Sequence, residues 1–164
     1  MIRIPFSRDY FSDEAKNRLS GINVSLEYDN IESGLFKTAT FLCDETFGEE
    51  TYNKLLSVYG EEIPEPPEEQ KVILTALDYL QRGLIHMTIF DDLISLIVKI
   101  GNDGITVKKS NDETTLFRYQ QDDLGNKLIN NSWFWLGKLI ELLNKYTEIL
   151  QEWMMSEKYH DLVS

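Results

Sequence analysis

The chain has 164 residues, a length that fits one domain, and its 28 acidic against 16 basic side chains give a formal charge of −12. Hydrophobic residues make up 42% and aromatic residues 12% of the chain, which is enough for a packed core and excludes global disorder. The acidity argues against a protein that binds nucleic-acid phosphates or an anionic membrane surface, because no basic field would attract either.

A single cysteine, Cys43, excludes a disulfide within the chain and any C-x-x-C metal or redox motif. The N-terminal residues are charged and interrupted, so no secretory apolar region is expected there. Apolar runs such as Leu93–Val98 are far shorter than the ~20 residues that span a bilayer. We therefore expect a soluble intracellular protein.

Residues 1–23 are predicted to form a partly irregular arm, in which Ser12–Ala15 has the pattern of a helix start. Residues 24–164 are predicted to form a single helical domain. Its first helix is expected over Glu27–Glu45, because apolar residues recur there every three or four positions. The residues of this stripe are Ile31, Leu35, Ala39 and Leu42.

Gly48 is expected to interrupt the helical pattern, and a short second helix is predicted over Glu49–Tyr59. Residues 61–68 contain three prolines, which exclude a continuous helix and favour a rigid, solvated loop. A polyproline recognition segment is the alternative interpretation of this loop.

A third helix is predicted to begin at Pro67, which suits a first helical turn. It either continues to about Leu96 or breaks near Asp91-Asp92. Its expected buried stripe consists of Ile73, Leu77, Leu80, Leu84 and Met87.

The pattern then changes to one typical of strands. Two β-branched runs, Ile97–Ile100 and Ile105–Lys109, flank a short polar segment and predict a β-hairpin at about residues 97–109. The predicted hairpin turn consists of Gly101, Asn102, Asp103 and Gly104.

A capping box at Ser110 and Glu113 predicts the start of a last helix that runs almost to the C-terminus. About 42 helical residues would extend ~60 Å, so this helix must bend, at Gly125 or at Asn130-Asn131, or project from the body. If it projects, its apolar stripe needs a neighbouring subunit. The predicted fold class is mainly α: a helical bundle of four or five helices with one β-hairpin inserted before a long C-terminal helix.

No catalytic or metal-binding motif stands out. His86 and His160 each lack a second histidine or cysteine at helical spacing, so no zinc site is predicted. The doublets Asp91-Asp92 and Asp122-Asp123 favour solvated helix faces, since adjacent helical residues point about 100° apart. Cys43 is expected to pack in the core. We therefore predict no cofactor and no catalytic residue.

One of the three tryptophans in the C-terminal part of the chain is a candidate for an interaction surface. Trp135 and Trp153 lie on the main stripe of the last helix, whereas Trp133 is offset by two residues and faces elsewhere. Trp133 and Phe134 are therefore candidates for contact with another subunit. The residues Lys99, Lys108 and Lys109 make the predicted hairpin locally basic and are further candidates, although guarding a strand edge against aggregation is their alternative role.

The segment Ile100–Ile105, followed by Ser110, Tyr119-Gln120 and the Leu-rich last helix, resembles a family of unknown function encoded in prophage structural-gene clusters of Bacteroidetes. Its earlier part also fits, with Ile22–Val24 and the apolar stripes of the first two helices. The resemblance covers about residues 22–146 and rests on packing and turn features. It transfers no catalytic residue to this chain.

The resemblance implies a virion protein of the neck, similar to head–tail connector or adaptor proteins that assemble as rings. Its partners would then be further copies of itself and portal or tail proteins, with no nucleic acid or membrane. Its location would be the bacterial cytoplasm or the virion. A small intracellular protein-binding or regulatory module is the alternative function, and a metal-dependent enzyme with carboxylates from different helices is a third.

Overall fold

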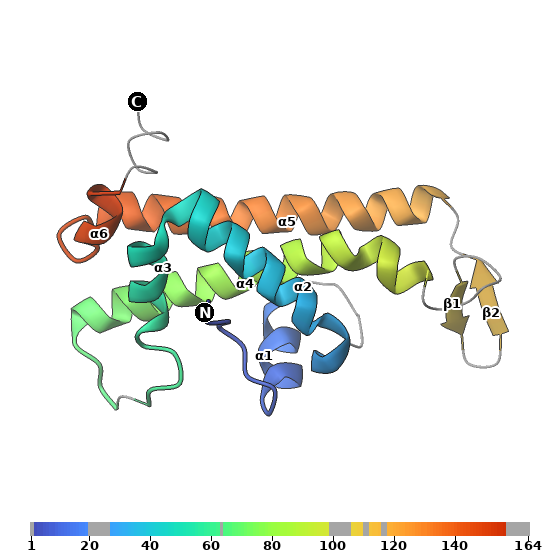
Figure 1. Cartoon of the computed structure of the whole chain (residues 1–164), viewed down its shortest axis with the longest axis horizontal. Helices are drawn as coiled ribbons and strands as arrows, with labels where there is room; N and C mark the ends of the chain where they lie inside the picture. Colours follow the sequence, from blue (N-terminus) through green and yellow to red (C-terminus); the bar gives the residue numbers. More distant parts are fainter. Residues whose placement is uncertain are drawn as a thin grey trace.

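The computed structural model describes residues 2–19, 27–62, 64–98, 106–109, 112–115 and 118–156, and from 93 to 122 it describes the backbone alone. Helices dominate these residues (Figure 1). In chain order the elements are α1 (Phe11–Arg18), α2 (Tyr28–Phe41), the π-helical turn η1 (Leu42–Phe47), α3 (Glu49–Leu56), α4 (Glu68–Val98), β1 (Thr106–Lys109), β2 (Asp112–Thr115), α5 (Arg118–Lys145) and α6 (Gln151–Met154).

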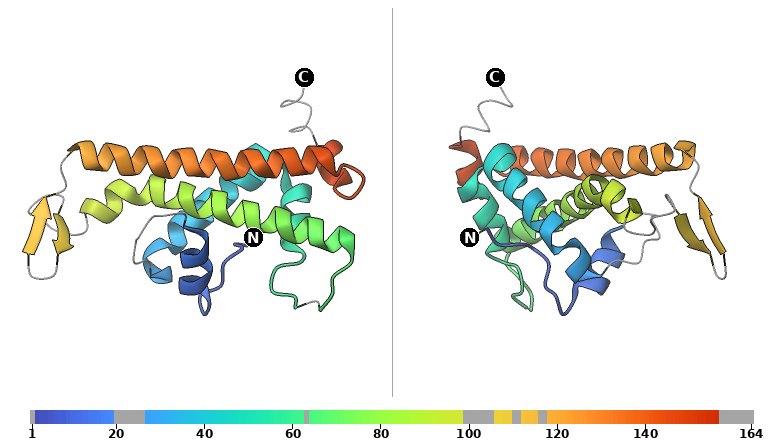
Figure 2. Two further views of the ribbon diagram at one scale, coloured as in Figure 1. Left: turned by 180° about the vertical axis from the view of Figure 1, so that it is seen from behind. Right: turned by 45° about the vertical axis from the view of Figure 1, so that its right-hand side comes forward.

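Two long helices, α4 and α5, form the frame of the molecule and lie side by side in opposite directions (Figures 1 and 2). At 1.5 Å per residue they extend ~46 and ~42 Å. They approach closely at Gly83, where an added Cβ would lie 2.6 Å from Cδ2 of Leu136. The Ser132 hydroxyl donates a hydrogen bond of 3.0 Å to the Gly83 carbonyl. The apolar stripe of α5 is therefore covered within its own chain.

The shorter helices α1, α2 and α3 each pack against α4. Helix α2 crosses α4 at Gly34, where an added Cβ would lie 2.0 Å from Oδ2 of Asp92. The stripe predicted for the first helix is buried in this contact, and every member is 0% exposed: Ile31, Leu35, Ala39 and Leu42.

The N-terminal arm contributes to the same core. Phe6, Phe11 and Ala15 are buried, and Phe6 packs edge-on against Phe11 with ring centroids 5.8 Å apart. The Gln81 side-chain amide of α4 donates a hydrogen bond of 2.7 Å to the Pro5 carbonyl. These contacts join the described part of the arm to the helical domain.

The first predicted helix, Glu27–Glu45, changes character before its end. After α2 the chain continues as the π-helical turn η1, and Gly48 follows with φ 88°, a left-handed conformation that suits glycine. The wider π-helical turn brings Leu42, Cys43 and Phe47 into the core, while Asp44 and Glu45 stay exposed.

The predicted β-hairpin at 97–109 is wrong, and with it the predicted fold class. Ile97 and Val98 belong to α4, and β1 pairs antiparallel with the later strand β2, with Lys109 opposite Asp112. A helix already formed gains one hydrogen bond for each added residue, which outweighs the weak strand preference of β-branched residues. The described residues hold six α-helices rather than four or five.

Two further expectations around the hairpin are affected. Lys99 and the predicted turn residues Gly101, Asn102, Asp103 and Gly104 lie outside the described residues. The capping box does not begin a helix, because Glu113 belongs to β2 and α5 starts at Arg118.

The last helix does not bend where the sequence predicted. Helix α5 passes through Gly125 and Asn130-Asn131 without a break and ends at Lys145. The chain then turns back into α6, which places Trp153 in the core against Phe47 with ring centroids 5.9 Å apart. The long helix therefore ends without a glycine or an Asn pair, and the chain that follows it buries Trp153. In the described part of the chain, no helix combines the length and apolarity needed to cross a membrane.

Candidate interaction surface

The inner face of α5 is fully buried. The residues that face α4 recur every three or four positions, and each is 0% exposed: Leu128, Ser132, Leu136, Leu139 and Leu143. A helix advances about 100° per residue, so Trp133 and Phe134 point away from this stripe. Their side chains are 52% and 54% exposed. Two consecutive large aromatic residues are thus exposed to solvent, with side chains about 100° apart around the helix.

Neighbouring side chains hold Phe134 in place. Its ring meets Trp135 edge-on with centroids 5.1 Å apart, and the Lys138 ammonium lies 5.8 Å from its centroid. Trp135 in turn packs against Tyr79 of α4 at 5.7 Å and lies under the Arg82 guanidinium at 4.7 Å. A supported aromatic side chain loses little conformational entropy on binding, which suits it to be an anchor in an interface.

Lysines accompany the aromatic pair along the outer side of α5. Lys138 and Lys145 are exposed and seven positions apart, so they lie on one side of the helix together with Phe134. Glu141 lies between them, 3.5 Å from the Lys138 ammonium. Trp133 lies beside this group, about 100° around the helix from Phe134, and we call Trp133, Phe134, Lys138 and Lys145 the aromatic–lysine face.

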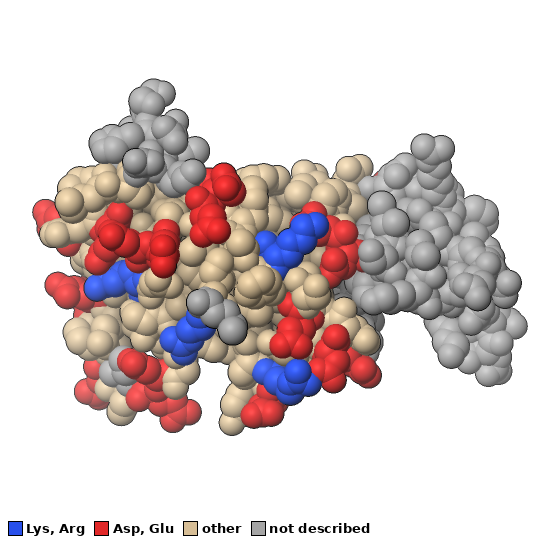
Figure 3. Space-filling view, viewed as in Figure 1, with Lys and Arg blue, Asp and Glu red and all other residues tan. Residues whose placement is uncertain are grey.

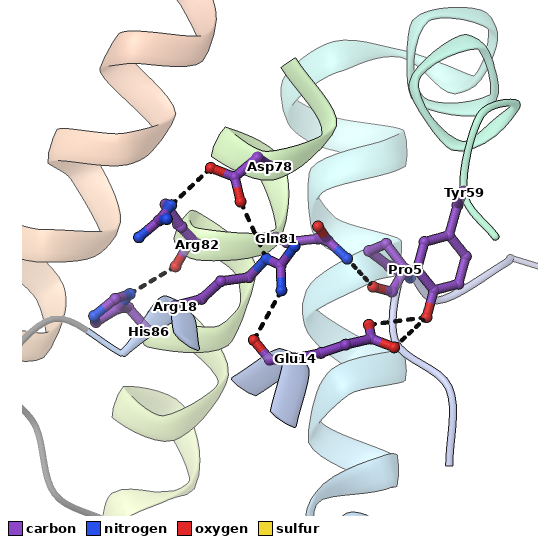
Figure 4. A network of polar contacts seen from close by, with 8 residues as sticks. All are labelled: Pro5, Glu14, Arg18, Tyr59, Asp78, Gln81, Arg82 and His86. Atoms are coloured by element: carbon purple, nitrogen blue, oxygen red, sulfur yellow. Dashed lines mark hydrogen bonds and ion pairs between the residues drawn. The ribbon is translucent and has the colours of Figure 1, made fainter. Parts of the chain in front are cut away.

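A polar network supports this face from behind (Figure 4). Asp78 of α4 lies between two guanidiniums, with its carboxylate oxygens 3.2 Å from Nε of Arg18 and 2.8 Å from Nε of Arg82. Arg18 also donates a hydrogen bond of 2.9 Å to the Glu14 carbonyl. The network thereby links α1 to α4 and positions Arg82 over Trp135.

A second group of contacts in Figure 4 closes the N-terminal side. The Tyr59 hydroxyl lies 2.9 Å from both carboxylate oxygens of Glu14. Burial and the neighbouring Glu14 carboxylate raise the pKa of Tyr59 to about 12, so its hydroxyl remains a donor at neutral pH. This contact ties the end of the α3 region to α1.

His86 is a core residue. Its side chain is 0% exposed, and Nδ1 donates to the Arg82 carbonyl at 2.6 Å, which leaves Nε2 unprotonated. Among the described residues Nε2 has no hydrogen-bond partner. Burial lowers the pKa of His86, so the imidazole is neutral at neutral pH. His160 lies outside the described residues.

The remaining candidates for chemistry are dispersed. Burial, with Asp44 nearby, raises the pKa of the Cys43 thiol to about 11, so the thiol is protonated and a poor nucleophile at neutral pH. Asp91 and Asp123 are exposed, and Asp92 lies where α2 crosses α4. Across the described ranges, no three His, Cys, Asp or Glu side chains are grouped to hold a metal ion.

The charge of the protein is concentrated in one segment. Residues 27–69 contain twelve acidic and two basic residues, a net charge of −10 out of −12 for the whole chain. All twelve acidic residues are exposed. Figure 3 shows acidic side chains spread over the face formed by α2, α3 and the following loop, with few basic side chains among them. We call this face the acidic layer.

The structure brings together only part of the predicted surface. Trp133 and Phe134 are adjacent on α5, but Lys108 and Lys109 belong to β1, which lies beyond the end of the α4–α5 pair (Figure 1). Trp133 itself is ~22 Å along the axis from the start of α5.

The prediction missed Lys138, Lys145 and Arg82. A signal for the lysines was present, since Phe134, Lys138 and Lys145 recur at spacings of four and seven, which define one helix side. Arg82 gave no such signal, because its role depends on the packing of α4 against α5.

Residues 43–162, or 120 of the 164, match a family described as "Family of unknown function (DUF6712)". The match runs from η1 to beyond α6 and includes both long helices and the aromatic–lysine face. No curated protein and no solved structure matches the chain.

Proposed function

The chain belongs to the family of unknown function DUF6712, and from its surface we propose that it is a non-enzymatic assembly protein of a phage or prophage virion. It acts by self-association and by docking to a partner. In the virion it belongs to the neck, as a head–tail connector or adaptor, with portal or tail proteins as further partners. This last assignment rests on fold-level analogy.

One observation carries the proposal: the aromatic pair on the outer side of α5. Trp133 and Phe134 are each more than half exposed, although the inner side of the same helix is fully covered by its own chain. Helix α5 therefore needs no partner for its core stripe, and the pair is surplus to folding. Aromatic residues are enriched in protein–protein interfaces, and polar residues form the rim around them.

The shape of the molecule supports the same function. The α4–α5 pair extends ~46 Å, somewhat more than the ~40 Å diameter of a compact chain with the expected radius of gyration of ~15 Å. A long, stiff pair of helices with an exposed outer side suits a subunit that contacts neighbours along its length.

A small intracellular binding module is the second candidate, because a single aromatic pair would also suit one modest docking site. The two functions differ in solution. An assembly protein forms multimers whose mass rises with concentration, whereas a binding module stays monomeric or stops at a dimer.

The test is the absolute mass by light scattering across a concentration series. We expect the wild type to exceed the monomer mass of 19.1 kDa, and the double variant Trp133→Ala/Phe134→Ser to remain at that mass. Tyr10→Ser is the matched control, because Tyr10 is 68% exposed but lies outside the aromatic–lysine face. A wild type that stays at 19.1 kDa throughout would reject self-association.

A further inference from the structure

We propose that the aromatic–lysine face of α5 docks on the acidic layer of a second copy, around Phe41, Asp44 and Glu45. The proposal rests on the self-association argued above and names the surface that receives α5. Its occupant is a second copy of this chain, chosen because the charges of the two surfaces are complementary.

Charge is the first argument. In residues 133–145 of α5 the exposed lysines Lys138 and Lys145 outnumber the single acid Glu141, whereas residues 27–69 carry a net charge of −10. An α5 face that met the α5 face of another copy would place like charges together, at an energetic cost. Contact with the acidic layer instead places lysines against carboxylates.

The second argument locates the contact within the acidic layer. Phe41 is 44% exposed at the end of α2, and the exposed acids Asp44 and Glu45 follow within the π-helical turn. This arrangement mirrors the aromatic–lysine face, since an exposed aromatic ring lies beside two charges of the opposite sign. Helical turns of the π type are frequent at functional sites.

The other exposed aromatic residue of this layer, Phe36, is less suited. The acids near the start of α2, Asp29 and Glu32, already form ion pairs with Arg8. Between Lys37 and Lys54, in contrast, the sequence contains no basic residue. Among the described residues no ion pair engages Asp44 or Glu45, so these carboxylates can meet lysines of another molecule.

The ion pairs of the described residues leave the two surfaces available. Among the described residues, no ion pair joins Lys138 or Lys145 to an acid of residues 27–69. Within the described part of the chain, the one ion pair of Lys138 is with Glu141 of its own helix, at 3.5 Å, and both residues are exposed. Exposed pairs of this kind contribute little to stability, so the Lys138 ammonium can exchange partners at low cost.

The experiment reverses the charge of each surface separately. One variant is Lys138→Glu/Lys145→Glu, and the other is Asp44→Lys/Glu45→Lys. The matched control, Glu61→Lys/Glu62→Lys, makes the same change of charge in the same segment but away from Phe41. All of these side chains are exposed, so helical content by circular dichroism should equal that of the wild type.

We expect each of the first two variants to raise the dissociation constant of self-association at least about tenfold. The control variant should stay within about twofold. An equimolar mixture of the two defective variants should restore association, because each reversed surface then meets one of opposite charge. Raising the salt concentration from about 0.05 to about 0.5 M should weaken the wild-type contact.

Two results would overturn the proposal. If Asp44→Lys/Glu45→Lys behaves like the control, or if the mixture stays dissociated, the acidic layer around η1 does not receive α5. Association that still depends on Trp133 and Phe134 would then leave the proposed function standing. A wild type that is monomeric at every concentration would reject both proposals together.

Discussion

The two sides of α5 differ sharply in exposure although both carry large apolar residues. On the inner side Leu136 and Leu139 are 0% exposed, while on the outer side Trp133 and Phe134 are 52% and 54% exposed. The inner side holds the fold together, and the outer side is free to contact another molecule. Under the proposed function one helix separates stability from association, so a substitution on either side should change only one of them.

Loss of Trp153 is expected to have the largest effect, because this residue closes the inner side at the end of α5. Its ring is 0% exposed, and Nε1 donates a hydrogen bond of 2.8 Å to Asn144. Trp153→Ala should lower the free energy of unfolding by ~3–5 kcal/mol, measured by urea denaturation. Trp133→Ala on the outer side should change it by less than ~0.5 kcal/mol. Equal losses for the two variants would contradict the separation.

Two glycines test the same contrast without changing an aromatic residue. An Ala side chain at Gly83 would place Cβ 2.6 Å from Leu136 and should cost ~1–3 kcal/mol, whereas Gly137 on the outer side has nothing within 4 Å of an added Cβ. Gly137→Ala should be neutral or stabilise by up to ~1 kcal/mol through helix propensity.

Thermal and urea denaturation of the two variants measure this difference. Shortening the obstructing side chain in Gly83→Ala/Leu136→Ala should recover part of the loss that Gly83→Ala alone causes. A tolerated Gly83→Ala would show that α4 and α5 can separate at this point at little cost.

The smallest effect concerns His86, which lies next to the network behind the outer side. Burial lowers the pKa of His86 in the folded protein, so below the ordinary value of ~6.5 the unfolded chain binds more protons. The stability from the neutral imidazole is therefore complete above pH ~6.5 and falls as the pH drops below it. The slope for one proton is at most ~1.4 kcal/mol per pH unit.

His86→Gln should remove this dependence between pH ~7.5 and ~5.5, as urea denaturation at each pH would show. Self-association of the wild type, after correction for the unfolded fraction, should keep the same dissociation constant over this range. If the dissociation constant instead changed with pH in the wild type but not in His86→Gln, protonation of His86 would affect self-association through the outer side of α5.

Helical periodicity predicted much of the core. The stripe of Ile31, Leu35 and Ala39 is buried, and the pattern that begins at Pro67 forms one helix to Val98. These helices could be predicted because their buried apolar residues recur every three or four positions.

The irregular features depended on contacts between distant residues. The π-helical turn differs from an α-helix by one residue per turn, which changes neither the composition nor the run of apolar residues. No Gly or Pro marks the end of α5 at Lys145, and the contact of Trp153 with Phe47 beyond it joins residues far apart in the sequence. The hairpin was misplaced because Ile97 and Val98 suit a strand locally but continue α4.

The part of the candidate surface that depends only on the angular position of a side chain around the helix was predictable. The offset of Trp133 from Trp135 placed it off the stripe, and its side chain is exposed. The role of Arg82 was not predictable, because only the packing of α4 beside α5 brings its guanidinium over Trp135. Whether Trp133 and Phe134 bind another molecule remains a prediction for the mass measurement.

The single cysteine is an internal probe of local opening in the turn η1. Cys43 is buried within η1, directly before Asp44, and its protonated thiol reacts with a labelling reagent only when this turn opens. The rate of thiol labelling therefore measures how often the turn opens at the surface where a second copy is proposed to dock. A copy bound there would hold the turn closed, so labelling would slow as protein concentration rises, with no need to introduce a probe.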